Sequence, residues 1–283
     1  MRSFLMRVAA FGLLAMADLQ PAAAQVKSLI MGGYNSSADA AIKTDLIGSD
    51  ARFNQALSSS YDYSTGGLPT LAYLQQFNSV LVFSDRVNVD PTALSDLLGN
   101  YVLGGGGVVI ATFWGQQVGN AGGLLNSTGF NPFTNPTSEA YISHTLGTYN
   151  PLDPLMQGVT ALSSNQYNGD YLAGLDTGAT LAASWNDGRP LAGYNATHKV
   201  AAITLNPNVV TLSNATGDYQ RLFANALAFT GGETAISAVP EPATWAMLML
   251  GFGAIGASLR SAKRRSDEKF DAKIKRITYG VQA

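Results

Sequence analysis

Between residues 26 and 232, short apolar runs alternate with amphipathic stretches. The runs at 28–31, 79–83 and 108–111 are predominantly apolar, as expected of strands that are covered on both faces. Between the last two runs, apolar residues recur at spacings of three and four, which predicts a helix that buries one face. These residues are Leu94, Leu97, Leu98, Tyr101 and Val102. The β-α-β order predicts a doubly wound, mostly parallel α/β sheet.

Turn and cap residues set the ends of the predicted elements. Asp90 followed by Pro91 predicts the start of that helix, and glycines 104–107 predict its end. These glycines stand between a helix and a strand, so they form a tight connection and not a phosphate-binding loop, which would precede a helix.

The remaining segments predict three more strands and two more helices. Asn186-Asp187-Gly188 predicts a hairpin between the strands 180–185 and 191–194, and another strand follows at 199–205. Residues 39–57 are weakly helical. We expect Asp218 to cap a final helix that ends at Gly231-Gly232.

The N-terminus has the three parts of a secretory signal peptide. Arg2 and Arg7 form a positive region, an apolar run follows at 8–17, and Ala22 and Ala24 supply a small-residue cleavage site. The run is too short to cross a bilayer, which needs about 20 apolar residues. We therefore predict a signal peptide at residues 1–24, export through the Sec machinery, and an exported domain at residues 25–232.

A second apolar segment lies near the C-terminus. Eighteen uncharged residues separate Glu241 from Arg260. As a helix they would extend about 27 Å, close to the roughly 30 Å thickness of the hydrocarbon core. We predict a transmembrane helix at 243–259 and, by the positive-inside rule, a basic cluster in the cytoplasm. The cluster comprises Arg260, Lys263, Arg264 and Arg265.

The tripeptide Pro240-Glu241-Pro242, followed by an apolar helix and a basic cluster, resembles the PEP-CTERM sorting signal of exported bacterial proteins. The resemblance covers residues 239–265, with a short linker before it at 233–238. It implies recognition by an exosortase-like membrane transpeptidase, cleavage near the motif and delivery to the cell surface or the extracellular space, often alongside exopolysaccharide. The charged tail at 266–283, which we expect in the cytoplasm, departs from this pattern. An ordinary single-span anchor is the alternative interpretation.

Composition narrows the chemistry that is available to the domain. The chain has no cysteine, which excludes disulfides, thiolate metal sites and cysteine nucleophiles. Residues 25–238 carry seven basic and fourteen acidic side chains. An acidic body of this kind offers no basic face to nucleic acid.

Several segments of the exported domain resemble class I glutamine amidotransferase-like and trehalose-utilisation-like domains. They are residues 79–85, 90–103, 105–112, 153–159 and 221–229. The resemblance implies a flavodoxin-like sheet and, in the amidotransferases, a nucleophilic cysteine on a sharp turn after a strand. Because the chain has no cysteine, amidotransferase activity does not follow from the resemblance.

We predict no catalytic residue, no cofactor and no metal site. The chain has only two histidines, lacks a G-x-S-x-G nucleophile turn, and shows no acidic or histidine cluster with metal-ligand spacing. Any ligand is expected near region 113–151, which follows a central strand at the edge where open α/β sheets bind ligands; an Asn/Gly-rich surface loop is the alternative interpretation of this region. The candidate residues for this ligand cleft are Asp85, Trp114, Gln116 and His144.

These observations favour an exported surface or matrix protein with a non-catalytic domain. One alternative is a secreted hydrolase that acts on a carbohydrate or peptide through Asp85 or His144. Another is a carbohydrate-binding module, since aromatic and amide side chains suit sugars. Convergence of Asp85, Trp114 and His144 in one pocket would favour the hydrolase. A pocket with aromatic residues but no carboxylate–histidine pair would favour the binding module. A pocket filled by side chains would favour the non-catalytic protein.

Overall fold

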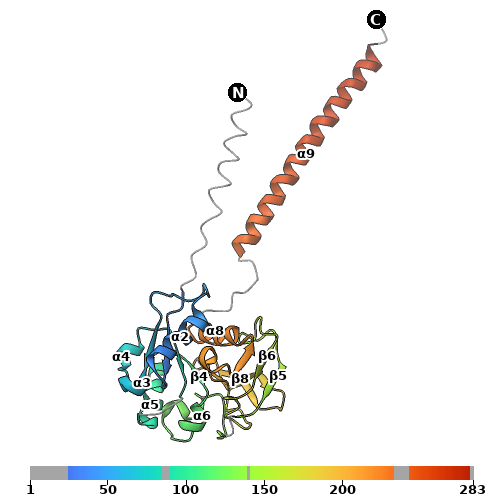
Figure 1. Ribbon diagram of the computed structural model, residues 1–283. Coiled ribbons are helices and arrows are strands. Elements are labelled where there is room, and N and C mark those ends of the chain that lie inside the picture. Colours follow the sequence, from blue (N-terminus) through green and yellow to red (C-terminus); the bar gives the residue numbers. More distant parts are fainter. Residues whose placement is uncertain (1–24, 85–88, 139–140, 233–241, 281–283) are drawn as a thin grey trace. The chain divides into compact units, whose positions relative to one another are not determined.

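A computed structural model describes residues 25–84, 89–138, 141–232 and 242–280 (Figure 1). The chain divides into two compact units, Met1–Ala235 and Ile236–Ala283. The predicted signal peptide, with Ala22 and Ala24, lies outside the described residues, as do Asp85, Pro240 and Glu241.

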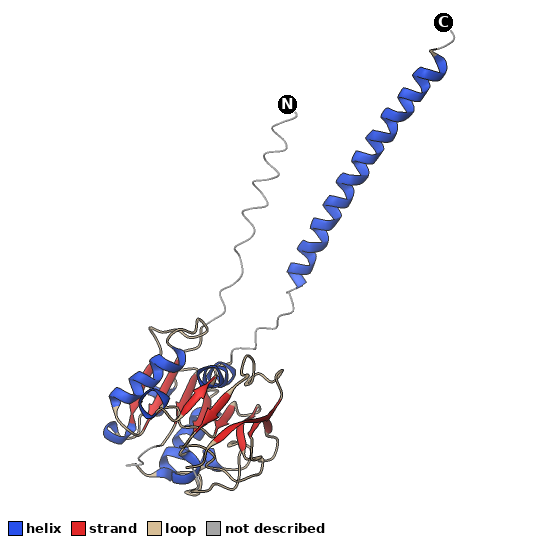
Figure 2. Ribbon diagram, turned by 45° about the vertical axis from the view of Figure 1, so that its right-hand side comes forward, coloured by secondary structure: helices blue, strands red, loops and turns tan. Residues whose placement is uncertain are grey.

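One ten-stranded sheet forms the centre of the first unit (Figure 2). The strands are β1 (Ser28–Gly32), β2 (Ser59–Asp62), β3 (Ser79–Val82), β4 (Gly107–Ala111), β5 (His144–Tyr149), β6 (Leu162–Ser164), β7 (Thr180–Trp185), β8 (Pro190–Asn195), β9 (Val200–Ile203) and β10 (Ala215–Gly217). Their order across the sheet is β10-β6-β5-β7-β8-β9-β4-β3-β1-β2.

Half of this sheet has the predicted flavodoxin-like arrangement. Strands β2, β1, β3, β4 and β9 are mutually parallel and adjacent in that order. Numbered along the chain, this is the 2-1-3-4-5 order of a doubly wound flavodoxin-like sheet. The apolar runs that predict the central strands lie in β3 and β4, whose residues are all buried.

The other half corrects the expectation of a mostly parallel sheet. Strands β8, β7, β5, β6 and β10 extend the sheet from β9 through antiparallel pairs alone. The predicted hairpin joins β7 to β8, because a short Asn-Asp-Gly turn can only reverse the chain. Strands β6 and β10 have three residues each, and β5 is mostly polar, so no apolar run marks these strands in the sequence.

Helices cover both faces of the parallel half, as a doubly wound fold requires. They are α2 (Ser36–Ile47), α3 (Tyr63–Gly66), α4 (Leu71–Leu74), α5 (Pro91–Leu103), α6 (Trp114–Gln117), the 3₁₀ helix η1 (Leu124–Asn126), α7 (Val209–Leu212) and α8 (Tyr219–Thr230). Helices α2 and α8 share one apolar core through Ile42, Leu46 and Phe223. Helix α5 contributes Leu94 and Leu98 to a second core.

Cap residues explain where these helices begin. The Asp90 carboxylate accepts hydrogen bonds from the amides of Thr92 and Ala93, and Pro91 occupies the first turn of α5, as predicted. Helix α2 begins after Asn35, whose side chain accepts from the Ala38 amide. It ends at Ile47 and not near residue 57, because the chain turns at Gly48 toward β2.

Asp218 precedes α8 as predicted, but its carboxylate does not cap that helix. It accepts hydrogen bonds from the backbone amides of Thr160 and Ala161 instead. These two bonds hold the pKa of Asp218 below its usual range. The residue therefore ties the start of α8 to the segment that leads into β6.

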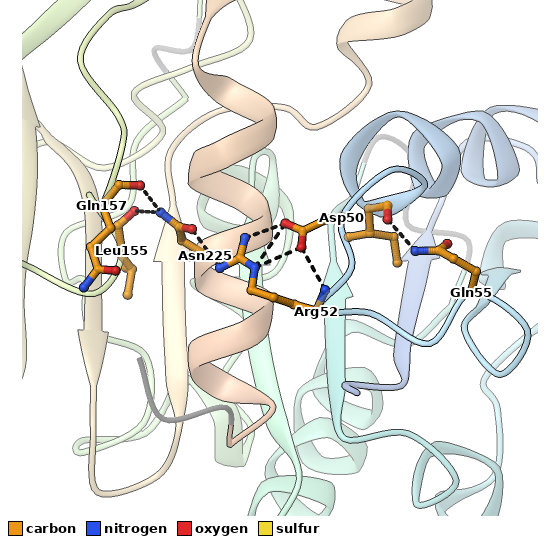
Figure 3. A network of polar contacts seen from close by, with 7 residues as sticks. Asp50, Arg52, Gln55, Leu155, Gln157 and Asn225 are labelled. Atoms are coloured by element: carbon orange, nitrogen blue, oxygen red, sulfur yellow. Dashed lines mark hydrogen bonds and ion pairs between the residues drawn. The ribbon is translucent and has the colours of Figure 1, made fainter. Parts of the chain in front are cut away.

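A polar network joins α8 to two loops (Figure 3). The guanidinium of Arg52 donates to both Asp50 oxygens and to Oδ1 of Asn225 on α8. The Asn225 amide then donates to the carbonyls of Leu155 and Gln157. The network fixes the loop before β2 and the loop before β6 against the same helix.

The second unit contains helix α9 (Pro242–Tyr279). This helix includes the predicted segment 243–259 but continues through the basic cluster into the charged tail. Among the described residues, no helix is long and apolar enough to cross a membrane, so the predicted span at 243–259 is not supported. The uncharged stretch is short and is interrupted by Gly251, Gly253 and Gly256.

Candidate functional site

The topology singles out one edge of the sheet, where β1 and β3 end. From β1 the chain passes through α2 to β2, and from β3 it passes through α5 to β4 on the other side. The two connections diverge at this point, between the carboxyl ends of β1 and β3. In open α/β sheets this switch point is the usual place for a ligand.

Asp39 lies next to this switch point, in the first turn of α2. Its side chain is fully buried, and neither carboxylate oxygen has a hydrogen-bond partner among the described residues. Gly32, the last residue of β1, makes room for it: a Cβ at that position would lie 1.9 Å from Oδ1 of Asp39. A carboxyl group in such a position is costly to ionise.

Burial raises the pKa of Asp39 to about 8, and the nearby negative charge of Asp62 adds to the effect. The group therefore keeps its proton at neutral pH. A protonated carboxyl group can donate a hydrogen bond or act as a general acid.

Asp62 ends β2 and has the opposite character. Its carboxylate accepts hydrogen bonds from the side chains of Ser36, Ser64 and Thr65 and from the Ser64 amide. Burial acts to raise the pKa of Asp62, but these hydrogen bonds outweigh it and hold the pKa below its usual range. The two acidic groups near the edge thus differ in charge at neutral pH.

Ser84 continues the edge beyond β3. It is fully buried, and its hydroxyl has no hydrogen-bond partner among the described residues. Its carbonyl accepts from the amide of Phe113, beyond the end of β4, and the hydroxyl of Tyr63 donates to the Phe83 carbonyl. The backbone at the end of β3 is therefore held from both sides.

A second buried carboxyl group, Asp170, anchors the turn after β4. It accepts hydrogen bonds from the Thr112 hydroxyl and the Gly115 amide. Burial raises the pKa of Asp170 to about 6, although these hydrogen bonds oppose the shift. Because both carboxylate oxygens accept hydrogen bonds from residues of the turn, Asp170 holds the turn in position.

Aromatic rings surround the same turn. The Phe113 ring lies 5.6 Å from that of Tyr167 and 6.3 Å from that of Tyr141, measured between centroids. The Tyr141 residue is 66% exposed, whereas Phe113 is buried. The group thus presents one exposed ring supported by two others.

The structure separates the residues that the sequence marks as a ligand cleft. Trp114 is fully buried in an apolar core, and its indole nitrogen donates to Asn126. Gln116 is exposed on α6. His144 lies in β5, within the antiparallel half, where its ring stacks on Trp185. Trp114 and His144 therefore do not share a pocket, and region 113–151 contains α6, η1 and β5.

Asp39 and Ser84 are not predicted as site residues from the sequence. An aspartate in the first turn of a helix ordinarily favours the helix dipole and attracts no attention. The sequence feature that could have identified Asp39 is its position after a strand that ends in Gly32-Gly33. The carboxyl end of such a strand is the edge where a parallel sheet binds ligands.

Three comparisons with known proteins bear on these features. Residues 238–265 match the family model of the PEP-CTERM protein-sorting motif, so the chain carries this motif at its C-terminus. No curated protein matches the chain.

Two solved structures resemble the first unit. A protein of Bacteroides uniformis described as ThuA-like has 13% sequence identity and a TM-score of 0.50, with 75% of this chain and 94% of that chain covered. A Thermoplasma acidophilum protein described as a GMP synthase component has 10% identity and a TM-score of 0.49, with 73% and 94% covered. The fold of the first unit is thus similar to that of the ThuA-like structure.

Proposed function

We propose that this chain is an exported bacterial surface or extracellular-matrix protein that an exosortase-like transpeptidase processes. The observation that carries the proposal is the PEP-CTERM match at residues 238–265. A secretory signal at residues 1–24 would deliver the chain to the Sec machinery, and the two signals agree on export. The linker 233–238 would separate the domain from the sorting signal.

In this proposal, residues 25–232 form a non-catalytic amidotransferase-like domain. The absence of cysteine from the sequence supports it, because the amidotransferase reaction needs a thiolate nucleophile. The turn after β4 is also occupied by structural contacts: Thr112 bonds to Asp170, and Trp114 is buried in the core.

The sorting motif itself provides the test. We expect Glu241→Gln to accumulate as an unprocessed precursor in the native host, since it changes the only charged residue of the Pro-Glu-Pro tripeptide. Ser237→Ala, just outside the matched residues, is the control and should be processed normally. Fractionation followed by detection of a tag placed within the tail 266–283 measures the fraction that keeps its C-terminus. Equal processing of both variants would overturn the proposal.

A further inference from the structure

A cleft of about 300 Å³ lies in the antiparallel half of the sheet, away from the switch point. Strands β5, β6 and β10, which are adjacent in the sheet, supply most of it. The residues after β6, before β10 and in the β7–β8 turn complete its walls. The volume lies at the lower end of the range for small-molecule sites.

The lining of this cleft is uniform in chemistry. Hydroxyl and amide side chains make up nearly all of it, and none of the described residues that line it carries a carboxylate or an ammonium or guanidinium group. The main contributors are Ser143, Thr145, Ser163, Asn165, Ser213 and Thr216. Such groups donate and accept hydrogen bonds equally well, which matches a ligand with many hydroxyl groups.

The floor of the cleft contains two buried residues, each with one polar atom that no described residue contacts by a hydrogen bond. His144 and Asn214 both line it, and both are buried. Nε2 of His144 and Oδ1 of Asn214 have no hydrogen-bond partner among the described residues.

The floor is also held rigidly. The His144 ring stacks on the buried ring of Trp185 with centroids 5.3 Å apart, and the Trp185 indole donates to Thr204. On the Nδ1 side, Asp187 lies 3.7 Å from the His144 ring and is itself paired with Arg189. Burial lowers the pKa of His144, so the ring is neutral at pH 7 although Asp187 opposes the shift.

A saccharide fits these features better than an extended peptide does. Peptides commonly add to a free strand edge through backbone hydrogen bonds. Here β6 is already paired with both β10 and β5, and β5 is also paired with β7. Strands β5 and β6 therefore offer side chains and no free backbone edge to the cleft, whereas β10, the end strand of the sheet, is paired on one side only.

We propose that this cleft binds a short, uncharged saccharide through the hydroxyl and amide side chains of β5, β6 and the segment before β10. The site is a binding site without hydrolytic chemistry, since the described lining has no carboxylate to serve as acid or base. This proposal is independent of the proposed sorting, because the cleft lies in the first unit and does not involve the C-terminal motif.

The test is ligand-observed NMR and calorimetry on the full chain. The neutral probes are cellotetraose, maltotetraose and N,N′-diacetylchitobiose, and the charged probes are trigalacturonate and chitosan dimer. We expect at least one neutral probe to bind more tightly than both charged probes. Thr145→Val should weaken that binding about fivefold, because it removes one hydrogen-bonding hydroxyl from an exposed position of β5.

Thr148→Val is the matched control, because Thr148 is exposed on the same strand but does not line the cleft. It should leave binding unchanged, and circular dichroism should show the same melting temperature for both variants. Three results would overturn the proposal: no binding of any neutral probe, equal weakening by both variants, or tighter binding of the uncharged peptide tetraglycine than of the saccharides.

Discussion

Asp39 is a carboxylic acid that the fold keeps both buried and unpartnered among the described residues. Its ordinary pKa is near 3.8, and burial raises it to about 8 in the folded protein. Between these values the folded protein holds a proton that the unfolded chain has lost. Stability therefore falls as pH rises from about 4 to 8, by up to roughly 1.4 kcal/mol per pH unit from this group.

Asp39→Asn should remove that pH dependence. We expect the variant to unfold at a higher temperature than the native chain at pH 8 and to differ less at pH 5, because an amide needs no proton to be neutral. Melting curves recorded by circular dichroism at pH 5, 6, 7 and 8 measure the difference.

Asp62→Asn is the control for this series. The pKa of Asp62 is lowered, so its stabilising hydrogen bonds are present above its unfolded pKa and are lost only as pH falls through the folded value. The fall in stability above pH 5 should therefore remain in this variant, and it should end at a somewhat lower pH because the Asp62 charge no longer raises the pKa of Asp39. An Asp39→Asn variant with the native pH dependence would show that Asp39 is ionised in the folded state.

Individual site residues were the least predictable part of this chain. The aromatic and amide composition of region 113–151 pointed to Trp114 and His144, but the sequence does not show that one is core and the other belongs to a strand of the opposite half. Asp39 is distinguished by a buried carboxyl group that has no hydrogen-bond partner among the described residues. This environment depends on contacts between segments that are distant along the chain, so it leaves no local sequence pattern.

At the scale of secondary-structure elements, the strands and helices predicted correctly are those that a local sequence pattern determines. The buried strands β3 and β4, the capped helix α5 and the β7–β8 hairpin follow from apolar runs, cap residues and turn residues. The short strands β6 and β10 were not predicted, because a segment of three residues with a single buried apolar side chain acquires strand geometry only by pairing with a neighbour.

The hydrogen bonds of Asn225 connect α8 to two loops, and a substitution can measure how much they contribute to the stability of the fold (Figure 3). Asn225→Ala would leave the Leu155 and Gln157 carbonyls and one Arg52 N–H group without this partner. We expect the free energy of unfolding to fall by about 2–3 kcal/mol, as measured by urea denaturation.

Gln220→Ala, on the same helix, is the comparison. Gln220 is exposed and its amide donates to Asp45, so its loss should cost less than about 1 kcal/mol. If the two variants were equally stable, the Asn225 contacts would contribute nothing beyond an ordinary surface hydrogen bond, and the two loops would be held by apolar packing alone.

At the scale of the whole molecule, the chain combines a domain with a doubly wound sheet, similar in fold to a ThuA-like structure, and a sorting motif. The sequence predicted both, because the motif is a local pattern and because apolar strands separated by amphipathic helices are typical of a doubly wound sheet. The antiparallel extension beyond β9 and the continuous helix α9 emerged only from the structure. The extension also contains the polar cleft for which we propose a saccharide.

Sorting through the C-terminal motif is the central claim, and the intact mass of the protein tests it most directly. The full chain is expressed in two otherwise identical hosts, one with an exosortase and one without. Our account predicts that residues beyond about 239 are lost only in the host with the exosortase, while residues 1–24 are lost in both. The same mass in both hosts, with the C-terminus intact, would contradict it.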